Sequence, residues 1–514
     1  MATTRRAFLT GVVASGLGTS LLGRAGLALP GSGRALDELD FGELESLAAR
    51  IQETAPASLQ GLLIDELRGG KRDLGTIVAA TALANARTFG GEDYDGYHCM
   101  MALAPALMMA GRLSPAARPL PVLKVVYRTA NRIQEFGGRS HELLHAVAIP
   151  SRESREVELR RFHAAVRDRD LEAAESAFAA LSQDGPRAAY DALLSLVQED
   201  VDVHRVVLAW RAWETLSLCG EQHANTLMRQ CVHFCVQAEA ERVRRGRPEP
   251  RLRALLPELL AEPGLAGAAA REAGSTRHTS DAELEELAEV VFRADREEAA
   301  RAMVAALAAG WSHRDAGEAL SLAANRLLLH DSGRSSAQPG KPAGSVHGAS
   351  VGVHASDAAR AWRNIAAVDD ARHGAAGLIA GAFHTAGQSG LVGAEPFPYR
   401  GRMDELEQGD RTQLLAAASA AIEAGDQPLA AAAAARWCAA GHPAEPLFDL
   451  LLAYAVSEDG ALHAEKYFAT IAEEFAAARP AFRASHLVAL ARVTASEHGW
   501  AAPGVAEARE RMAT

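Results

Sequence analysis

Residues 154–199 read SREVELRRFHAAVRDRDLEAAESAFAALSQDGPRAAYDALLSLVQE, and apolar residues recur three and four positions apart through most of this stretch. That spacing places apolar side chains on one face of an α-helix. Residues 97–113, YHCMMALAPALMMAGRL, follow the same pattern. The sequence holds no run of alternating β-branched residues long enough for a sheet, and no fixed repeat period. We therefore expect an all-α fold, either an irregular helical bundle or a solenoid-like array of helical hairpins.

The composition agrees with a folded, helix-rich protein. Of the 514 residues, 48% are hydrophobic, 23% are charged and 5% are aromatic. Alanine-rich runs such as LAAAAAARWCAAG, residues 429–441, favour helix because alanine loses no side-chain entropy there. The net charge of −12 argues against a general nucleic-acid binder, which needs a concentrated basic surface.

The N-terminal residues resemble an export signal. Residues 3–30, TTRRAFLTGVVASGLGTSLLGRAGLALP, place a pair of arginines before a short, weakly apolar segment. This arrangement is typical of the twin-arginine pathway, and the apolar part is too short for a stable membrane span. We expect residues 1–35 to be a signal and short linker, read by the twin-arginine export machinery, and the protein to be periplasmic or extracellular.

Composition also divides the remaining chain. We expect an N-terminal helical half at 36–243, a linker rich in Pro, Gly and Arg at 244–281, and a C-terminal helical half at 282–514. Within the second half, residues 331–350, DSGRSSAQPGKPAGSVHGAS, have the composition of a flexible loop, which would be either mobile or functional. We expect the two halves to share one core.

Two short motifs resemble metal sites, but each has a plainer interpretation. His141, Glu142 and His145 match H-E-x-x-H, yet a third ligand is missing at the expected distance downstream. Cys231 and Cys235 flank His233 and would form a C-x-H-x-C site. The chain has five cysteines, and buried apolar cysteines on a helix are the favoured interpretation of this pair.

Histidine is the unusual residue of this chain, with eighteen in all. A lone histidine inside a helix is usually a hydrogen-bonded core residue. Several such residues on different helices are harder to explain, because each has two ring nitrogens to satisfy away from water. A metal ion would satisfy several at once. The histidines embedded among apolar residues are His98, His145, His204, His223, His233, His354, His384 and His463.

Lysine is the scarce residue. Of 53 basic residues only Lys71, Lys124, Lys341 and Lys466 are lysines. Lys466 lies three residues after His463, so both would be neighbours on one helix. It points away from the apolar stripe of that helix, which leaves a solvated lysine as the alternative. That alternative fails if both faces of the helix are packed.

The sequence resembles the questin oxidase-like family at several short features that occur in order. VGVHASDAARAWRNIA, residues 351–366, is similar to its G-[IV]-H segment, and EDGALHAEKYFATIAEEF, residues 458–475, to its H-x-x-K-[YF] segment. DYDGYHCMMALAPALMMAG, residues 93–111, and DVHRVVLAWRAWETL, residues 202–216, lie where the family places its first two histidine helices. The resemblance spans roughly residues 85–490.

The resemblance implies a mononuclear non-haem iron site made by four histidines and a lysine carboxylated by carbon dioxide. The implied ligands are His98, His204, His354, His463 and carboxylated Lys466. A neutral lysine amine adds carbon dioxide to give an anionic oxygen donor, whereas arginine stays protonated in proteins. Such a donor set suits Fe(II), with Zn as the alternative, and leaves one position free for oxygen or substrate.

Other residues compete for roles around this site. His223 lies nineteen residues after His204, a spacing that suits two antiparallel helices, and we predict a catalytic part in which it orients a ligand or substrate. His145 and His384 are lesser candidates. Trp210, Trp213 and Tyr467 would either line an aromatic substrate pocket or pack between helices.

Three functions remain open from the sequence. The first is an exported, metal-dependent oxidoreductase, an iron oxygenase that acts on an aromatic or polycyclic small molecule. The second keeps the metal and the carboxylated lysine but hydrolyses its substrate, with a zinc-bound hydroxide. The third is a non-catalytic α-helical scaffold or binding protein whose histidines are structural.

Overall fold

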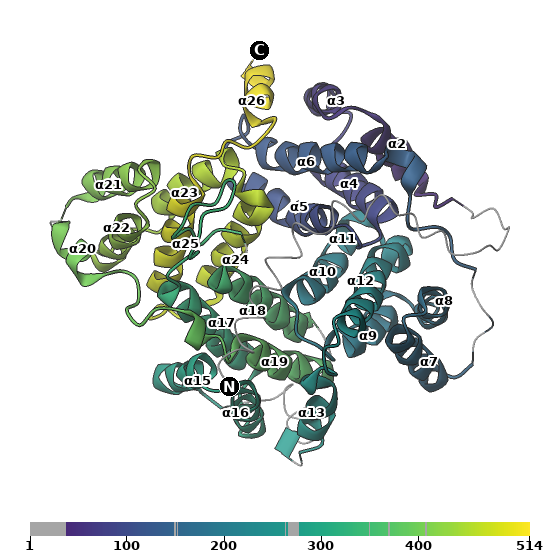
Figure 1. Cartoon of the computed structure of the whole chain (residues 1–514). Coiled ribbons are helices and arrows are strands. Elements are labelled where there is room, and N and C mark those ends of the chain that lie inside the picture. Colours follow the sequence, from purple (N-terminus) through teal and green to yellow (C-terminus); the bar gives the residue numbers. More distant parts are fainter. Residues whose placement is uncertain are drawn as a thin grey trace. The chain divides into compact units, whose positions relative to one another are not determined.

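The computed structural model of the chain describes residues 38–148, 151, 153–262, 264–265, 277–348, 350–368, 371–406 and 409–513. The chain divides into two units, Met1–Glu38 and Leu39–Thr514. Only Glu38 of the first unit is described, so the export signal predicted at residues 1–35 lies outside the described residues. The described part holds helices and two isolated β-bridges but no strand (Figure 1), which confirms the all-α prediction.

The second unit begins with helices that pack around a buried α4. Asp73 caps α4, where its side chain accepts a hydrogen bond from the Thr76 amide, and Asp93 caps α5 in the same way. From Ile77 to its end, every residue of α4 is buried. The helices are α2 (Glu45–Glu53), α3 (Pro56–Arg68), α4 (Leu74–Phe89), α5 (Tyr94–Arg112) and α6 (Leu120–Phe136).

Residues 154–199, whose apolar spacing predicts helix, form three successive helices. Ser154 and Asp170 cap the first two with their side chains, and Pro186 occupies the first turn of the third. Longer helices follow, and α13 lies within the predicted linker at 244–281. The helices are α7 (Arg155–Asp168), α8 (Leu171–Ser182), α9 (Pro186–Val197), α10 (Val203–Glu214), α11 (Leu216–Cys219), α12 (Ala224–Arg244) and α13 (Arg251–Leu260).

The C-terminal helices include one pair, α17 and α18, that packs closely. A Cβ added at Gly352 of α18 would lie 2.2 Å from the Leu328 Cα of α17, so only glycine permits this approach. The helices are α15 (Asp281–Arg293), α16 (Arg296–Ala308), α17 (His313–His330), α18 (Val351–Val368), α19 (Ala371–Thr385), α20 (Arg400–Glu405), α21 (Arg411–Glu423), α22 (Gln427–Ala439), α23 (Glu445–Ser457), α24 (His463–Ala477), α25 (Arg483–Glu497) and α26 (Val505–Ala513).

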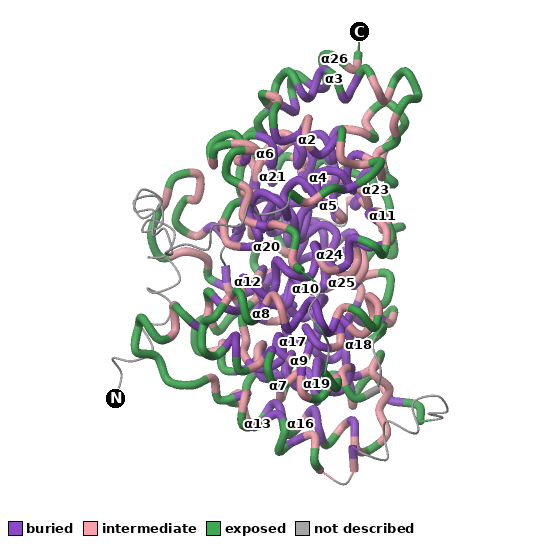
Figure 2. Tube along the Cα trace, turned by 90° about the vertical axis from the view of Figure 1, so that its right-hand side faces the viewer, coloured by how far each residue is buried: buried purple, intermediate pink, exposed green. Residues whose placement is uncertain are grey.

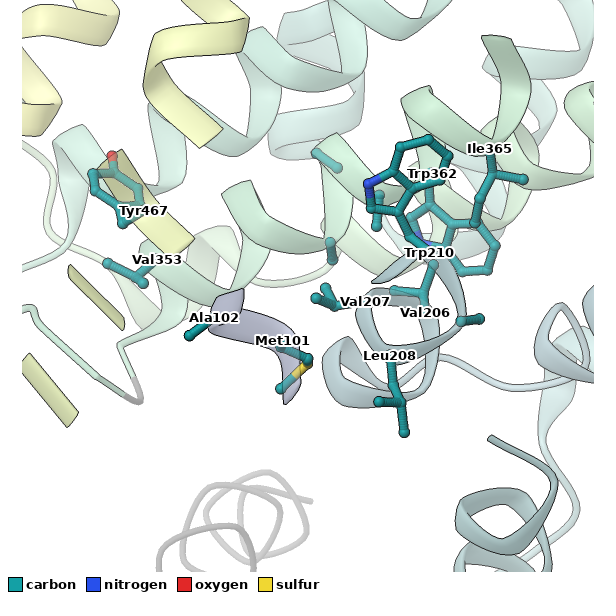
Figure 3. Packing of buried hydrophobic residues seen from close by; sticks show 14 of the residues in the cluster. Met101, Ala102, Val206, Val207, Leu208, Trp210, Val353, Trp362, Ile365 and Tyr467 are labelled. Atoms are coloured by element: carbon teal, nitrogen blue, oxygen red, sulfur yellow. The ribbon is translucent and has the colours of Figure 1, made fainter. Parts of the chain in front are cut away.

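Four helices from distant parts of the sequence form the centre of the unit. α5 contacts α10, α10 contacts α18, α18 contacts α24, and α24 returns to α5 (Figure 1). Figure 2 shows buried residues gathered along these central helices. Met101, Val207 and Val353 come from three of them and belong to one apolar core (Figure 3). The helices α10 and α18 lie on either side of the predicted linker, so the core draws on both halves of the chain.

Residues 331–350 are irregular, as their composition predicts, but they pack closely on the helices. The Arg334 amide donates a hydrogen bond to the Ser345 carbonyl, and the Gly344 amide donates one to the Arg334 carbonyl. Val346 and His347 are buried, and both backbone amides donate to Ser496 Oγ of α25. The described part of this segment is therefore a folded loop fixed to α25.

None of the described helices is both long enough and apolar enough to cross a membrane.

Candidate metal centre

The structure brings the rings of His98, His204, His354 and His463 together at the centre of the four-helix ring. The centroids of His98 and His204 are 4.9 Å apart, and those of His98 and His463 are 5.1 Å apart. His354 is 5.5 Å from His204 and 5.6 Å from His463. Each ring comes from a different helix. Rings that are neighbours in this group come from helices that contact each other. We call this group the histidine ring.

One nitrogen of every member has no partner. The Nε2 atoms of His98, His204, His354 and His463 are all buried, and none makes a hydrogen bond within the described residues. Buried polar atoms are nearly always hydrogen-bonded, and an unsatisfied one costs about 1–3 kcal/mol. Four such atoms in one group therefore need an explanation other than packing.

The opposite nitrogens of three rings are held by acceptors. His98 Nδ1 lies 2.7 Å from the Tyr94 carbonyl oxygen, and His463 Nδ1 lies 3.1 Å from that of Ala461. Because a carbonyl only accepts, Nδ1 carries the proton in both rings and Nε2 keeps its lone pair. His204 Nδ1 lies 3.4 Å from Asp202 Oδ1. Metal-binding histidines are typically oriented by such contacts.

Burial favours the neutral form of three members of the histidine ring. It is the largest cause that lowers the pKa of His98, His354 and His463 well below the usual value. The charge of Lys466, which lies three residues after His463 on α24, lowers the pKa of all three further. A neutral imidazole is the form that binds a metal ion.

Lys466 is buried, which rules out the solvated lysine. It is 2% exposed, and its neighbours Tyr467 and Phe468 are buried as well, so both faces of α24 are packed. Burial lowers the pKa of Lys466 to about 8; Asp357 opposes this shift and Arg211 adds to it. The amine is therefore easier to deprotonate than that of an ordinary lysine.

A second buried lysine fixes the rotation of α24. Lys124 Nζ of α6 lies 2.5 Å from Glu465 Oε1, and both side chains are 0% exposed. Lys124 also donates to the Ala455 carbonyl at 2.9 Å. Because Glu465 is held toward α6, the next residue, Lys466, projects from a different side of the helix.

Local backbone geometry sets two of the rings. Asp202 caps α10 by accepting from the amides of His204 and Arg205, so His204 lies in the first turn of that helix. Ala461 and Leu462, directly before His463, have φ of 52° and 63°. Non-glycine residues in this left-handed region cost roughly 1–2 kcal/mol each, and such strain persists where packing enforces it.

The donor types fit a metal ion, and the ring separations lie near those of bound imidazoles. Two imidazoles bound to one ion have centroids about 4.5 Å apart at right angles and about 5.2 Å apart at tetrahedral angles. The observed separations run from 4.9 to 5.6 Å. The described residues nevertheless contain no group of three His, Cys, Asp or Glu side chains that could hold a metal ion as they stand.

Several residues at the ring were missed in the sequence. The Tyr94 ring lies 4.3 Å from that of His98, and the Tyr97 ring lies 5.2 Å from that of His204. Tyr94 is four residues before His98, so helical spacing gave a usable signal. Asp202 was a recognisable cap residue two positions before His204.

The structure does not bring His223 to the histidine ring. It ends the 3₁₀ turn Glu221–His223, and its ring packs edge-on against Phe41 at 5.6 Å. Its predicted catalytic part therefore has no support from the geometry. His384 is buried on α19, and burial lowers its pKa to about 4. The Trp362 indole donates to His384 Nδ1 at 3.4 Å.

The two short metal-like motifs have structural explanations. His141 ends a 3₁₀ turn, and residues 142–148 are not helical, so His141 and His145 do not share a helix face. His233 Nδ1 lies 2.9 Å from Glu92 and its Nε2 lies 2.7 Å from Glu175, which leaves neither nitrogen for a metal. Cys231 and Cys235 are buried on α12, as the plainer interpretation predicts.

The aromatic candidates pack between helices. Trp210 and Tyr467 belong to the apolar core (Figure 3). Trp213 stacks on Tyr190 at 4.6 Å. This favours the packing interpretation over a substrate pocket for these three residues.

Comparison with known proteins gives no match to a family model, a curated protein or a solved structure.

Proposed function

We propose that the protein is a metal-dependent oxidoreductase, an iron oxygenase of the questin oxidase type that acts on an aromatic or polycyclic small molecule. The observation that carries this proposal is the set of four buried Nε2 atoms without partners, which surround one another beside a buried lysine. A scaffold protein would have no reason to gather four such atoms, because each one costs free energy.

In this proposal His98, His204, His354 and His463 hold the metal through Nε2, and Lys466 supplies a fifth donor. The contacts of Nδ1 with Tyr94, Ala461 and Asp202 keep three rings in the required orientation. The Lys466 amine, once deprotonated, adds carbon dioxide and becomes an anionic oxygen donor, with release of one proton. A bound iron ion would supply oxygen activation at its free position.

The surrounding residues would control access to the site. Met101, Val207 and Val353 are buried in the apolar core, on three of the helices that carry the ring (Figure 3). The Tyr94 and Tyr97 rings lie against His98, at 4.3 and 5.0 Å, and provide a flat surface for an aromatic substrate.

We also keep the proposal that the twin-arginine signal directs the protein to the periplasm or the extracellular space. It is supported by the sequence of residues 3–30 alone.

Metal analysis of the purified protein tests the proposal. We expect about one iron per chain, uptake of dioxygen when an aromatic substrate is supplied, and loss of both in Lys466→Ala. The matched control is Lys71→Ala, which removes an exposed lysine and should change neither measurement. One zinc per chain without dioxygen uptake would favour the hydrolase. A metal-free parent protein would contradict both.

A further inference from the structure

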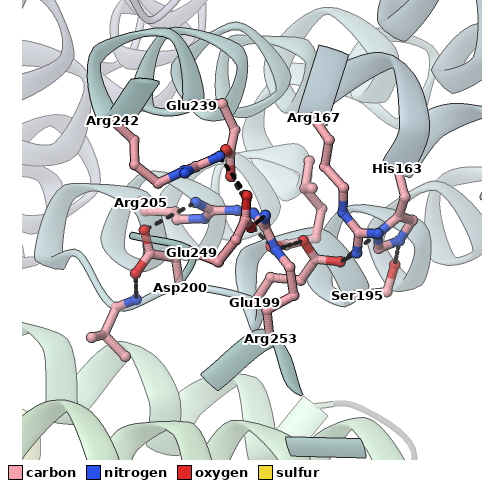
Figure 4. Close-up of polar contacts among 12 residues, drawn as sticks. His163, Arg167, Ser195, Glu199, Asp200, Arg205, Glu239, Arg242, Glu249 and Arg253 are labelled. Carbon is pink, nitrogen blue, oxygen red and sulfur yellow. Dashed lines mark hydrogen bonds and ion pairs between the residues drawn. The ribbon is translucent and has the colours of Figure 1, made fainter. Parts of the chain in front are cut away.

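Away from the histidine ring, a serine and a histidine lie within hydrogen-bonding distance of each other. Ser195 of α9 and His163 of α7 are 32 positions apart in the sequence, and the Ser195 hydroxyl lies 2.9 Å from His163 Nε2 (Figure 4). The other ring nitrogen, Nδ1, lies 2.7 Å from Glu199 Oε1. A hydroxyl, an imidazole and a carboxylate are therefore joined in sequence by two contacts.

These contacts give the His163 ring the tautomer of a general base. Glu199 pairs with Arg167 and, at 2.9 Å, with Arg253. Burial raises the pKa of Glu199, but the contacts with His163 and Arg167 outweigh this effect and lower the pKa to about 2. The carboxylate is therefore ionised and can only accept a hydrogen bond. Nδ1 of His163 then carries the proton, and in the neutral ring Nε2 keeps its lone pair toward Ser195.

The Ser195 hydroxyl has two acceptors within reach. It lies 2.7 Å from the Ala192 carbonyl oxygen of its own helix and 2.9 Å from His163 Nε2. A hydroxyl has one proton and rotates to suit its partners, so a rotation away from Ala192 directs that proton to the base. The oxygen is then a nucleophile in contact with its general base, and the base is oriented by a third group.

The site is in contact with solvent. The side chains of His163 and Arg167 are 19% and 44% exposed, and Ser195 is half-buried. Within the described residues the Arg167 guanidinium makes one hydrogen bond, which is to Glu199. Its other N–H groups remain available for the negative charge that develops on the oxygen of an attacked carbonyl. The site therefore has a partly exposed base and a cationic donor beside the carboxylate.

We propose that Ser195, His163 and Glu199 form a catalytic triad that hydrolyses small carboxylic esters. Ser195 Oγ bonds to the ester carbonyl carbon while its proton moves to His163 Nε2, and the leaving alcohol takes that proton as the carbon–oxygen bond breaks. Water then gives a proton to Nε2 and its oxygen bonds to the acyl carbon. The bond to Ser195 breaks, Oγ takes the proton back, and the free acid leaves. This activity is separate from the proposed function and needs no metal.

Covalent labelling of the purified full-length protein tests this inference. We expect phenylmethylsulfonyl fluoride to modify Ser195, which peptide mass spectrometry identifies. Ser485 of α25 is the matched control in the same sample. It is also half-buried, and its hydroxyl donates to a carbonyl three residues earlier, that of Phe482, at 2.8 Å.

No histidine nitrogen contacts the Ser485 hydroxyl within the described residues. Because a general base contributes about 10²–10⁴-fold, Ser195 should react at least about a hundredfold faster than Ser485. This comparison needs no variant, so it does not depend on how a substitution affects folding. Equal modification of the two serines, or none at Ser195, would overturn the inference.

Variants show whether the three residues act together. His163→Gln should slow the labelling of Ser195 about a hundredfold, and Glu199→Gln, which no longer fixes the tautomer, at least about tenfold. Hydrolysis of p-nitrophenyl acetate should be lost in Ser195→Ala and should survive treatment of the parent protein with a metal chelator. Unchanged labelling in His163→Gln, unchanged hydrolysis in Ser195→Ala, or hydrolysis that stops on chelation would overturn the inference.

Discussion

His163 and the members of the histidine ring are both held by helices inside the molecule, but they differ in what their ring nitrogens contact. His163 Nδ1 lies 2.7 Å from Glu199 and its Nε2 lies 2.9 Å from Ser195 Oγ (Figure 4). Glu199 in turn pairs with Arg167 and Arg253. In this network, which we call the Glu199 network, every ring nitrogen has a partner within the protein.

In the histidine ring, by contrast, Nδ1 is held in three members and Nε2 is left open in all four. The sequence environment does not distinguish the two regions, since His163 and His98 both lie inside amphipathic helices. The difference is whether the fold provides a hydrogen-bond partner for the second ring nitrogen. Where the described residues provide none, four times at one place, we propose that the missing partner comes from outside the chain.

The largest expected effect concerns metal affinity. His98→Ala removes one of the proposed donors and should lower iron affinity by at least a hundredfold. This loss exceeds the 10–100-fold loss that is typical when a residue contacting a metal ligand is changed. His163→Ala is the matched control from the Glu199 network and should keep the metal. Elemental analysis of both variants makes the measurement, and equal iron in the two would remove the distinction between the regions.

The next effect concerns stability. Glu199→Leu removes one carboxylate from Arg253, which keeps Glu239 and Glu249, and from the partly exposed Arg167, so the expected loss is about 1–3 kcal/mol. Urea unfolding measures this loss of unfolding free energy. Iron content per folded chain should stay unchanged, since Glu199 does not belong to the histidine ring. A loss below 1 kcal/mol would show that the network is not a stability element.

A pH dependence of similar origin follows. Burial raises the pKa of Glu199, but the contacts with His163 and Arg167 outweigh this effect and lower the pKa from 4.5 to about 2. Because the folded-state pKa is depressed, this stabilisation is fully present above pH 4.5 and is lost as the pH falls toward 2. The shift corresponds to about 3 kcal/mol. Glu199→Gln should flatten the acid limb of the stability curve, and an unchanged limb would contradict the assignment.

The smallest effect concerns the contact that orients one ring. Asp202→Asn keeps a side chain that caps α10, but it removes the charge beside His204 Nδ1. We expect about a tenfold loss of iron affinity, or roughly 1.4 kcal/mol, with little change in stability. Titration of iron into the two proteins provides the comparison. A variant that binds iron as tightly as the parent would show that Asp202 acts only as a cap.

The all-α fold could be predicted from the sequence because helical periodicity is local. The stretch 154–199 shows this: its apolar spacing, Ser154, Asp170 and Pro186 are all visible in the sequence, and they form α7, α8 and α9. The packing of the loop at 331–350 could not be predicted in this way. Its contact with Ser496 joins residues about 150 positions apart, and no local pattern encodes it.

The four histidines of the ring could be chosen from the sequence, but the residues around them could not. His98, His204, His354 and His463 were selected through a family resemblance, and Lys466 through its scarcity as well. The same scarcity applied to Lys124, which pairs with Glu465, the residue before Lys466. His223 shows the limit of chain spacing, because nineteen residues after His204 the chain has turned toward Phe41 instead.

X-ray absorption at the iron edge of the purified protein tests the central claim most directly. We predict a first shell of nitrogen and oxygen at about 2.0–2.2 Å, together with the outer-shell scattering that several imidazole rings produce. A sulfur neighbour, which Cys99 beside His98 would supply, or an absence of iron would contradict the claim that the four Nε2 atoms hold one metal ion.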